Sequence, residues 1–246
     1  MGSMVDAAIG NAVESLMTAN GMMAEEVIAG DAEINRLRFL IEEKCYVVLA
    51  TQQPMARDLR TVIAAIHFAI ELERIGDHAA GIARIVTRMA GMPLPLPSSP
   101  AEVEPEDPDE VEATTDDSLR DDALEAPPES PAEGEPPPKR LKLSRLPKMA
   151  KRARDMLNRA VAAYMERDVD KATAIVKRDQ KINRQYRKFF AEAMQTLNTQ
   201  HVAEMPTYLL WIAHNLERIG DRTTNLAERV IFMVTGQYTE VVEEYE

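Results

Sequence analysis

Two pairs of acidic side chains recur in the sequence at a spacing that could bind a cation. Glu73 precedes Asp77 by four residues, and Glu217 precedes Asp221 by the same interval. On a helix, this interval places both carboxylates on one face, where like charges cost about 0.2–0.5 kcal/mol per pair. We therefore expect a compensating positive charge close to each pair.

Two acid–amide pairs share this spacing, Asp31 with Asn35 and Asp179 with Asn183. If each pair lies on the helix before a carboxylate helix, antiparallel packing through a short loop brings it level with those carboxylates. Asn225 extends the second carboxylate series by one helical turn. The predicted metal-binding side chains are therefore Glu73, Asp77, Glu217, Asp221, Asp31, Asn35, Asp179, Asn183 and Asn225.

The oxygen-rich composition of this set favours a hard cation, such as manganese or magnesium, or iron. An equally simple interpretation is ordinary ion pairing, because Arg74 stands three residues before Asp77 and Arg218 three before Asp221. The spacing alone leaves both interpretations open.

Catalytic patterns are not evident in the sequence. No histidine follows a glutamate at the Glu-x-x-His spacing of di-iron bundles, and we expect His67 and His214 to be packing or surface residues. There is no glycine-rich phosphate loop and no Cys–His or Ser–His pairing. The sequence predicts a protein that is not an enzyme, with no catalytic residues.

The chain contains an internal duplication. Residues 71–84 read ELERIGDHAAGIAR and residues 215–228 read NLERIGDRTTNLAE. Upstream, GDAEIN (30–35) matches RDQKIN (178–183), in the same order. Whole segments repeated in one order indicate that a domain has been duplicated.

Each half has the apolar periodicity of three helices. The first helix ends at about residue 20, and the next two cover about 22–53 and 57–91. In the second half the expected helices cover about 141–167, 169–200 and 206–236. Short connections make successive helices antiparallel neighbours. The predicted fold class is all-α, with two tandem antiparallel three-helix bundles.

An acidic segment separates the two halves. Residues 93–138 contain fifteen Asp or Glu, one basic residue and twelve of the fifteen prolines, without an aromatic residue. This composition cannot bury enough surface to offset chain entropy, and it predicts a disordered linker. An acidic docking peptide is the alternative. The predicted domains are a first bundle (1–92), the linker (93–138), a second bundle (139–238) and an acidic tail (239–246).

Bulk composition indicates a cytoplasmic protein. The only cysteine is Cys45, no apolar run is long enough to span a bilayer, and no signal peptide opens the chain. The net charge of −12 comes from the acidic segment. The basic stretch that begins KRLK (139–142) is expected to be a solvated helix start and not a nucleic-acid site.

At its two LERIGD motifs the chain resembles the PhoU family, whose mark is a Glu/Asp-x-x-x-Asp motif in each of two three-helix bundles. QQPMARDLR (52–60) and ERIGDRTTNLAERVIFMVTGQ (217–237) are similar to further family segments. The resemblance covers nearly everything outside 93–138. Two departures are the acidic insert itself and a first helix that aligns only with the interior of the family's first helix.

The resemblance implies a regulator of phosphate uptake and a negative regulator of phosphate-starvation signalling. Family members link the ATPase subunit of a phosphate ABC transporter to a membrane sensor histidine kinase. They are often oligomeric, so a homodimer is expected, and they reach the membrane through these partners. Some carry iron or zinc on the motif carboxylates. The rival reading is a carboxylate-bridged helical metalloprotein with its own metal-dependent chemistry.

Overall fold

The computed structural model describes residues 1–92, 141–199 and 203–237, and it contains six helices and the turns between them, with no strand in these ranges. The predicted linker (93–138) and acidic tail (239–246) lie outside the described residues. The all-α prediction is confirmed.

The first half of the chain forms α1 (Gly2–Met17), α2 (Gly21–Gln52) and α3 (Ala56–Arg88). The backbone N–H of Met23 donates to the Asn20 side chain at 3.2 Å, which caps the start of α2. An asparagine at this position satisfies one of the N–H groups that a helix start leaves without a partner.

The second half repeats this plan with α4 (Arg145–Glu166), α5 (Val169–Thr199) and α6 (Glu204–Thr235). Gly236 ends α6 with a φ of 77°, a left-handed conformation that glycine adopts without steric cost. The sequence therefore predicted all six helices, with ends that differ by at most four residues.

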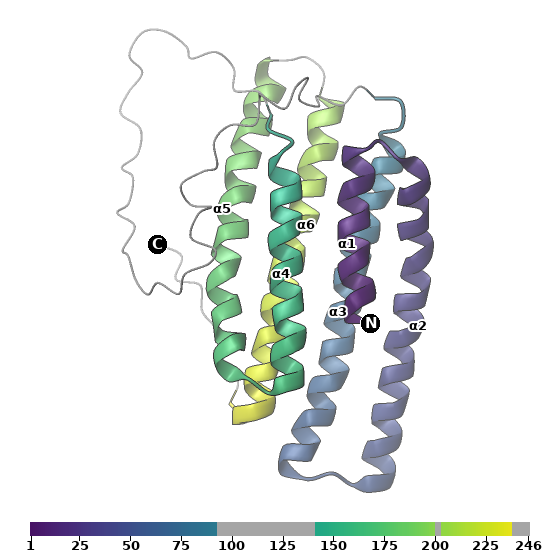
Figure 1. The fold of residues 1–246 in the computed structure, drawn as a ribbon, viewed down its shortest axis with the longest axis vertical. Helices are drawn as coiled ribbons and strands as arrows, with labels where there is room; N and C mark the ends of the chain where they lie inside the picture. The colour runs from purple at the N-terminus through teal and green to yellow at the C-terminus, as the bar shows by residue number, and fades with distance from the viewer. Residues whose placement is uncertain (93–140, 200–202, 238–246) are drawn as a thin grey trace, which may run out of the picture. The chain divides into compact units, whose positions relative to one another are not determined.

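The helices form two sets of three that meet along α3 and α6 (Figure 1). α3 contacts α1 and α2, whereas α6 contacts α4 and α5. α3 and α6 run antiparallel, since Arg60 near the start of α3 donates to the Met233 carbonyl near the end of α6 at 3.5 Å. The two central helices carry the repeated motifs, so the duplication places both motifs next to one another.

α1 and α4 form a second contact between the two sets. Arg154 of α4 donates two hydrogen bonds, of 2.9 and 2.8 Å, to the carboxylate of Asp6 on α1, and Asn158 adds a third at 3.1 Å. A bidentate pair of this kind fixes geometry as well as charge. It specifies how α1 lies against α4.

Apolar side chains from all six helices fill the interior. Ile75 and Ile82 of α3 and Leu216 and Ile219 of α6 are fully buried. Each side chain of this size contributes about 1.5–3 kcal/mol when it leaves water. These residues hold the central helices in place and thereby position the polar residues between them on the same helices.

Several large apolar side chains remain exposed along α2. Phe39, Tyr46 and Val47 have exposed fractions of 59%, 56% and 56%. Apolar groups gathered on one element of a monomer mark an interaction surface more often than isolated ones do. None of the described helices has an apolar stretch long enough to cross a membrane.

Candidate functional site

The first carboxylate set consists of Asp31 on α2 and Glu73 and Asp77 on α3. Asp31 is buried, with 9% of its surface exposed. A Cβ atom added at Gly76 would lie 3.5 Å from Asp31 Oδ1, so the carboxylate lies against the α3 backbone between the other two acids. The antiparallel α2–α3 hairpin brings the three residues together at the level that the sequence predicts.

These carboxylates repel one another. Burial is the main cause that raises the pKa of Asp31, the charge of Asp77 raises it further, and Arg84 opposes the shift. The pKa of Glu73 is also raised, first by burial and then by Asp77, against Arg74 and Arg38. Raised pKa values of this kind are expected where acids share a partly desolvated site without full compensation.

The amide nitrogen of Asn35 does not bind any carboxylate of the first set. Asn35 Nδ2 donates to the backbone carbonyl of Asp31 at 3.2 Å, on its own helix. Asp31 Oδ1 is buried and has no hydrogen-bond partner within the described part of the chain. A buried oxygen of this kind is costly unless a cation or water satisfies it.

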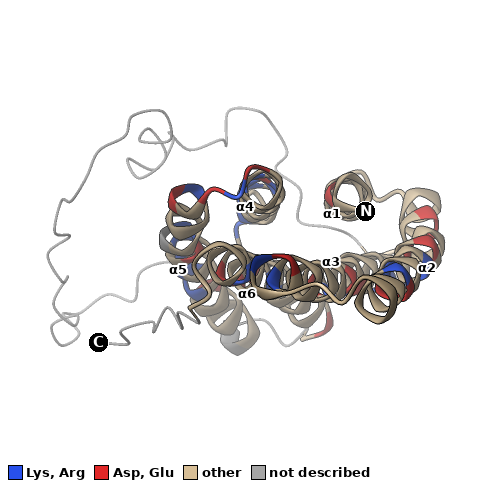
Figure 2. Ribbon diagram, turned by 90° about the horizontal axis from the view of Figure 1, so that it is seen from below, with Lys and Arg blue, Asp and Glu red and all other residues tan. Residues whose placement is uncertain are grey.

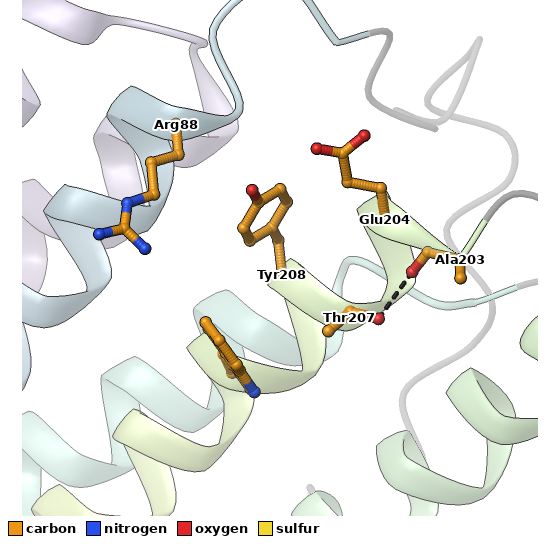
Figure 3. A pocket seen from close by; sticks show the side chains of 6 residues that line it. Arg88, Ala203, Glu204, Thr207 and Tyr208 are labelled. Atoms are coloured by element: carbon orange, nitrogen blue, oxygen red, sulfur yellow. Dashed lines mark hydrogen bonds between the residues drawn. The ribbon is translucent and has the colours of Figure 1, made fainter.

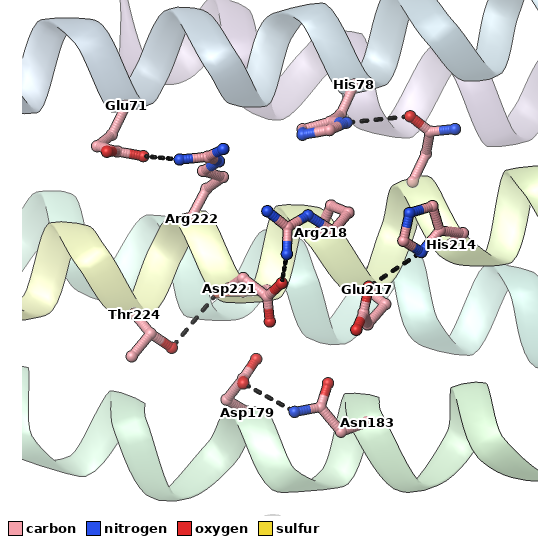
Figure 4. A network of polar contacts seen from close by, with 12 residues as sticks. Glu71, His78, Asp179, Asn183, His214, Glu217, Arg218, Asp221, Arg222 and Thr224 are labelled. Atoms are coloured by element: carbon pink, nitrogen blue, oxygen red, sulfur yellow. Dashed lines mark hydrogen bonds and ion pairs between the residues drawn. The ribbon is translucent and has the colours of Figure 1, made fainter. Parts of the chain in front are cut away.

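The second carboxylate set consists of Asp179 and Asn183 on α5 and Glu217 and Asp221 on α6 (Figure 4). Asn183 Nδ2 donates to Asp179 Oδ2 at 3.1 Å, and Asp179 is only 4% exposed. A Cβ atom at Gly220 would lie 2.6 Å from Asp179 Oδ1. Only glycine at this position lets the carboxylate approach α6 so closely.

Basic side chains lie beside the motif carboxylates of the second set. Arg218 Nη1 donates to Asp221 Oδ2 at 2.6 Å, and His214 Nδ1 lies 3.3 Å from Glu217 Oε2. The sequence did not assign His214 to this site, although its position one turn before Glu217 was the available signal. Burial raises the pKa of the neighbouring Tyr186, and Glu217 raises it further.

The ion pairs that the sequence allowed as an alternative are present in both halves. In the first half Arg74 Nη1 lies 3.6 Å from Asp77 Oδ2, which is longer than the Arg218–Asp221 contact. Arg74 is also more exposed than Arg218, so it compensates the first carboxylate set less completely.

The chemistry of these oxygen-bearing side chains favours metal binding, whereas their geometry does not. The burial of Asp31, the raised pKa values of Asp31 and Glu73, and an Asp31 oxygen without a hydrogen-bond partner in the described residues suit a cation. However, nowhere in residues 1–92, 141–199 and 203–237 do three His, Cys, Asp or Glu side chains converge closely enough to hold a metal ion. Asn225 is half-buried one turn beyond Asp221. Metal binding therefore stays a prediction.

A polar network joins α3 to α6 directly (Figure 4). His78 Nδ1 lies 3.0 Å from Asn215 Oδ1, and Arg222 Nη1 donates to Glu71 Oε2 at 3.5 Å. Burial lowers the pKa of His78, and the positive charges of Arg222 and Arg218 lower it further, whereas the hydrogen bond with Asn215 raises it. The neutral imidazole is therefore favoured. The sequence did not single out this network.

A pocket of about 420 Å³ lies where α3 ends and α6 begins (Figure 3). Tyr208 and Trp211 form an edge-to-face aromatic pair with ring centroids 6.4 Å apart. The Thr207 hydroxyl donates to the Ala203 carbonyl, so it is engaged with its own helix. No sequence pattern predicted this pocket, which is lined by Arg88, Ala203, Glu204, Thr207, Tyr208 and Trp211.

Comparison with known proteins gives one consistent answer. A family model described as the PhoU domain matches residues 1–86 and again residues 146–230. A phosphate-specific transport system accessory protein PhoU homolog from Clostridium acetobutylicum is 28% identical over 98% of this chain and 90% of its own length. The homolog of the same name from Rhizobium meliloti is 29% identical over 96% of this chain and 81% of its own length.

Solved structures agree with these matches. The crystal structure of PhoU from Pseudomonas aeruginosa superposes with a TM-score of 0.73 at 26% identity, covering 96% of this chain and 93% of that one. PhoU from Streptococcus pneumoniae gives a TM-score of 0.72 at 25% identity, covering 98% and 92%. The repeated motif, the two three-helix sets and the domain match in both halves together establish that this chain belongs to the PhoU family.

Proposed function

We propose that this protein is an accessory and regulatory protein of a phosphate-specific transport system. The observation that carries the proposal is the double match to the PhoU domain, one in each half of the chain. The named relatives, which span nearly the whole chain, are accessory proteins of phosphate-specific transport systems.

The mechanism that we propose is switching by contact. The protein would bridge the ATPase subunit of a phosphate ABC transporter and a sensor histidine kinase, restraining uptake and the starvation response when phosphate is plentiful. The two helix sets present related but not identical surfaces, because the motif that reads ELERIGDH in α3 reads NLERIGDR in α6. A duplicated scaffold of this kind can contact two different partners at once.

Complementation of a bacterial strain that lacks its own PhoU tests this proposal. In phosphate-rich medium the full chain should switch off a reporter of the starvation response and lower phosphate uptake. A pull-down of the tagged chain from the same cells should recover the transporter ATPase subunit and the kinase. A folded, expressed protein that leaves the reporter active and recovers neither partner would refute the adaptor role.

Metal binding is a further part of the proposal. Asp31, Glu73 and Asp77 would be the principal ligands in the first half, and Asp179, Glu217 and Asp221 in the second. Iron and zinc are the expected metals, with manganese and magnesium as alternatives. A metal would add positive charge beside Asp31 and Glu73, whose pKa values are raised by burial and by the neighbouring Asp77, and these raised values support the proposal.

We propose a homodimer and a cytoplasmic location as well. The exposed Phe39, Tyr46 and Val47 on α2 are the apolar side chains that a second copy would cover. Sedimentation of the parent and of a Phe39→Glu, Val47→Glu variant tests this arrangement. A parent that sediments as a monomer, or a variant that remains dimeric, would refute it.

A further inference from the structure

The pocket between the end of α3 and the start of α6 offers three kinds of chemical group in a small volume. Its volume of about 420 Å³ lies within the range of about 300–1,000 Å³ that is typical of small-molecule sites. The guanidinium of Arg88, the carboxylate of Glu204 and the rings of Tyr208 and Trp211 line it. Figure 3 shows Arg88 and Glu204 on either side of Tyr208. A ligand in this pocket therefore meets a cation, an anion and flat aromatic rings.

The charged and aromatic side chains of the pocket are available to a ligand. Arg88 and Glu204 are exposed, and neither side chain forms an ion pair or a hydrogen bond within the described part of the chain. Trp211 is 51% exposed, although tryptophan is on average one of the more buried residue types. Folding of the described residues therefore leaves all three of these side chains without the contacts that would normally engage them.

The duplicated framework does not account for this combination of residues. α3 and α6 are antiparallel copies of one another, so the opposite end of the pair carries the equivalent positions. At that end Ala64 and His67 take the places of the two aromatic residues. Arg60 takes the place of the acid, and it donates to the Met233 carbonyl at 3.5 Å. The aromatic pair and its charged neighbours thus belong to one end only, and the packing shared by both halves does not require them.

The helices that carry the pocket are held on both sides. Figure 2 shows α3 and α6 side by side between α2 and α5, and each helix of this row contacts the next. The rings of Tyr208 and Trp211 are 6.4 Å apart at an interplanar angle of 77°. This edge-to-face contact restrains both rings, so the indole is a preformed platform on a rigid element.

We propose that this pocket binds a nucleotide, with its base stacked on Trp211, its phosphate bound by Arg88 and its sugar hydroxyls donating to Glu204. The planar fork of an arginine matches a phosphate in a bidentate way. Aromatic side chains are platforms for stacked bases, and a carboxylate is a common acceptor for ribose hydroxyls. Inorganic phosphate offers only the first of these groups, and a nucleoside only the other two. Nucleotide binding here does not depend on the accessory role or on the metal binding proposed above.

The negative charge of Glu204 does not prevent a phosphate from binding in the same pocket. Glu204 is the first residue of α6, and no side chain caps this helix start in the described residues. The positive end of the α6 dipole therefore offsets part of the Glu204 charge. The guanidinium of Arg88, which comes from the other helix, supplies the cation for the phosphate.

Trp211 gives the experiment a built-in probe, because it is the only tryptophan in the chain. The full chain is titrated separately with AMP, adenosine and inorganic phosphate, and the indole is excited where tyrosine does not absorb. Stacking of the base should quench the emission, with a dissociation constant for AMP below about 1 mM. AMP should bind at least about tenfold more tightly than adenosine, which has no charged group for Arg88. Phosphate alone should leave the emission unchanged.

Matched substitutions locate the site. Arg88→Gln should weaken AMP binding at least about tenfold and leave adenosine binding unchanged, whereas Arg57→Gln, an exposed arginine near the other end of α3, should change neither. By calorimetry, Trp211→Leu should weaken AMP binding about tenfold, and Phe190→Leu, an exposed aromatic residue outside the pocket lining, should not. Circular dichroism checks that each variant is folded. If either pocket variant unfolds, Glu204→Gln takes its place, and it should weaken AMP and adenosine alike.

Three results would overturn the proposal. The first is an emission that shows no saturable change at AMP concentrations up to about tenfold above 1 mM. The second is adenosine or inorganic phosphate that binds as tightly as AMP, because the pocket would then not recognise base and phosphate together. The third is a loss of AMP binding in Arg57→Gln as large as that in Arg88→Gln, since this would be an effect of net charge and not of the pocket.

Discussion

His78 of α3 lies opposite Asn215 of α6, with Nδ1 3.0 Å from Oδ1. Because the motif is repeated, the two equivalent positions of the other half form a second contact. Asn215 occupies the position of Glu71 in the duplicated motif, and Arg222 occupies the position of His78. Glu71 and Arg222 are themselves paired, at 3.5 Å. The two contacts are therefore equivalent under exchange of the halves, so α3 and α6 cross with approximate two-fold symmetry.

Replacing Arg222 with leucine removes the cation beside the partly buried Glu71 carboxylate. We expect the free energy of unfolding to fall by about 1–2 kcal/mol, between the ranges for exposed and for buried ion pairs. Urea denaturation measures it. The swapped pair, Glu71→Arg with Arg222→Glu, should recover part of the loss. If the loss in free energy of unfolding of the swapped protein equals the sum of the losses of the Glu71→Arg and Arg222→Glu single variants, these residues do not interact energetically.

Gly220 should not tolerate alanine as well as Gly30 does. An added Cβ would lie 2.6 Å from Asp179 Oδ1, and Asp179 is buried and held by Asn183. At Gly30 an added Cβ meets nothing within 4 Å. We expect Gly220→Ala to be less stable than Gly30→Ala by about 1–3 kcal/mol.

The matched Gly30→Ala variant should be neutral or more stable than the parent by up to about 1 kcal/mol, since alanine is the better helix former. Thermal unfolding of both variants checks the difference. Equal melting temperatures would mean that Asp179 can move away from α6 at no cost.

The Asp6–Arg154 pair should make stability sensitive to acid. The hydrogen bonds from Arg154 hold the pKa of Asp6 below its ordinary value, burial opposes them, and the charge of Arg154 and the bond from Asn158 add to the lowering. A lowered folded-state pKa contributes stability that is complete above the unfolded value of about 3.9 and is lost as the pH falls through the folded value.

Asp6→Asn should therefore cost about 1 kcal/mol at neutral pH, a modest value because Arg154 is 42% exposed. The difference between Asp6→Asn and the parent should shrink below about pH 4. Urea unfolding over a series of pH values measures both effects, with the exposed Glu25→Gln as the control. If the stability difference between Asp6→Asn and the parent stays constant as the pH falls below about 4, the negative charge of Asp6 does not contribute to stability.

Removing the motif carboxylates should remove any bound metal. Protein purified without chelator or affinity metal is compared by elemental analysis with a Glu73→Gln, Asp77→Asn variant and with its Glu217→Gln, Asp221→Asn counterpart. We expect each variant to lose the metal bound by the half in which its carboxylates are changed, and to keep the metal of the other half.

A control for metal binding changes Glu25 and Glu26, two exposed acids on α2, to glutamine, and it should leave the metal content unchanged. Parent protein that contains no metal and takes up no iron, zinc, manganese or magnesium would refute the metal proposal. The carboxylates would then be the ion-pair partners of Arg74 and Arg218 that the structure already shows.

The sequence by itself determined the six helices, the duplication and the family. Helical spacing of apolar residues, the Asn20–Gly21 and Gly236 boundaries and the two LERIGD motifs are local properties, and local properties decide secondary structure. Hairpin register also follows from loop position, and for this reason Asp31 could be expected beside Glu73 and Asp77.

Only the tertiary structure decided how the two halves meet and which charges compensate one another. The contacts of His78 with Asn215 and of Glu71 with Arg222 join residues more than 130 positions apart, and no spacing rule within one helix predicts them. Likewise, the 2.6 Å bond from Arg218 to Asp221 and the weaker contact of Arg74 with Asp77 come from identical local spacing. Side-chain burial differs between the halves, and burial is set by packing across helices that are distant in sequence.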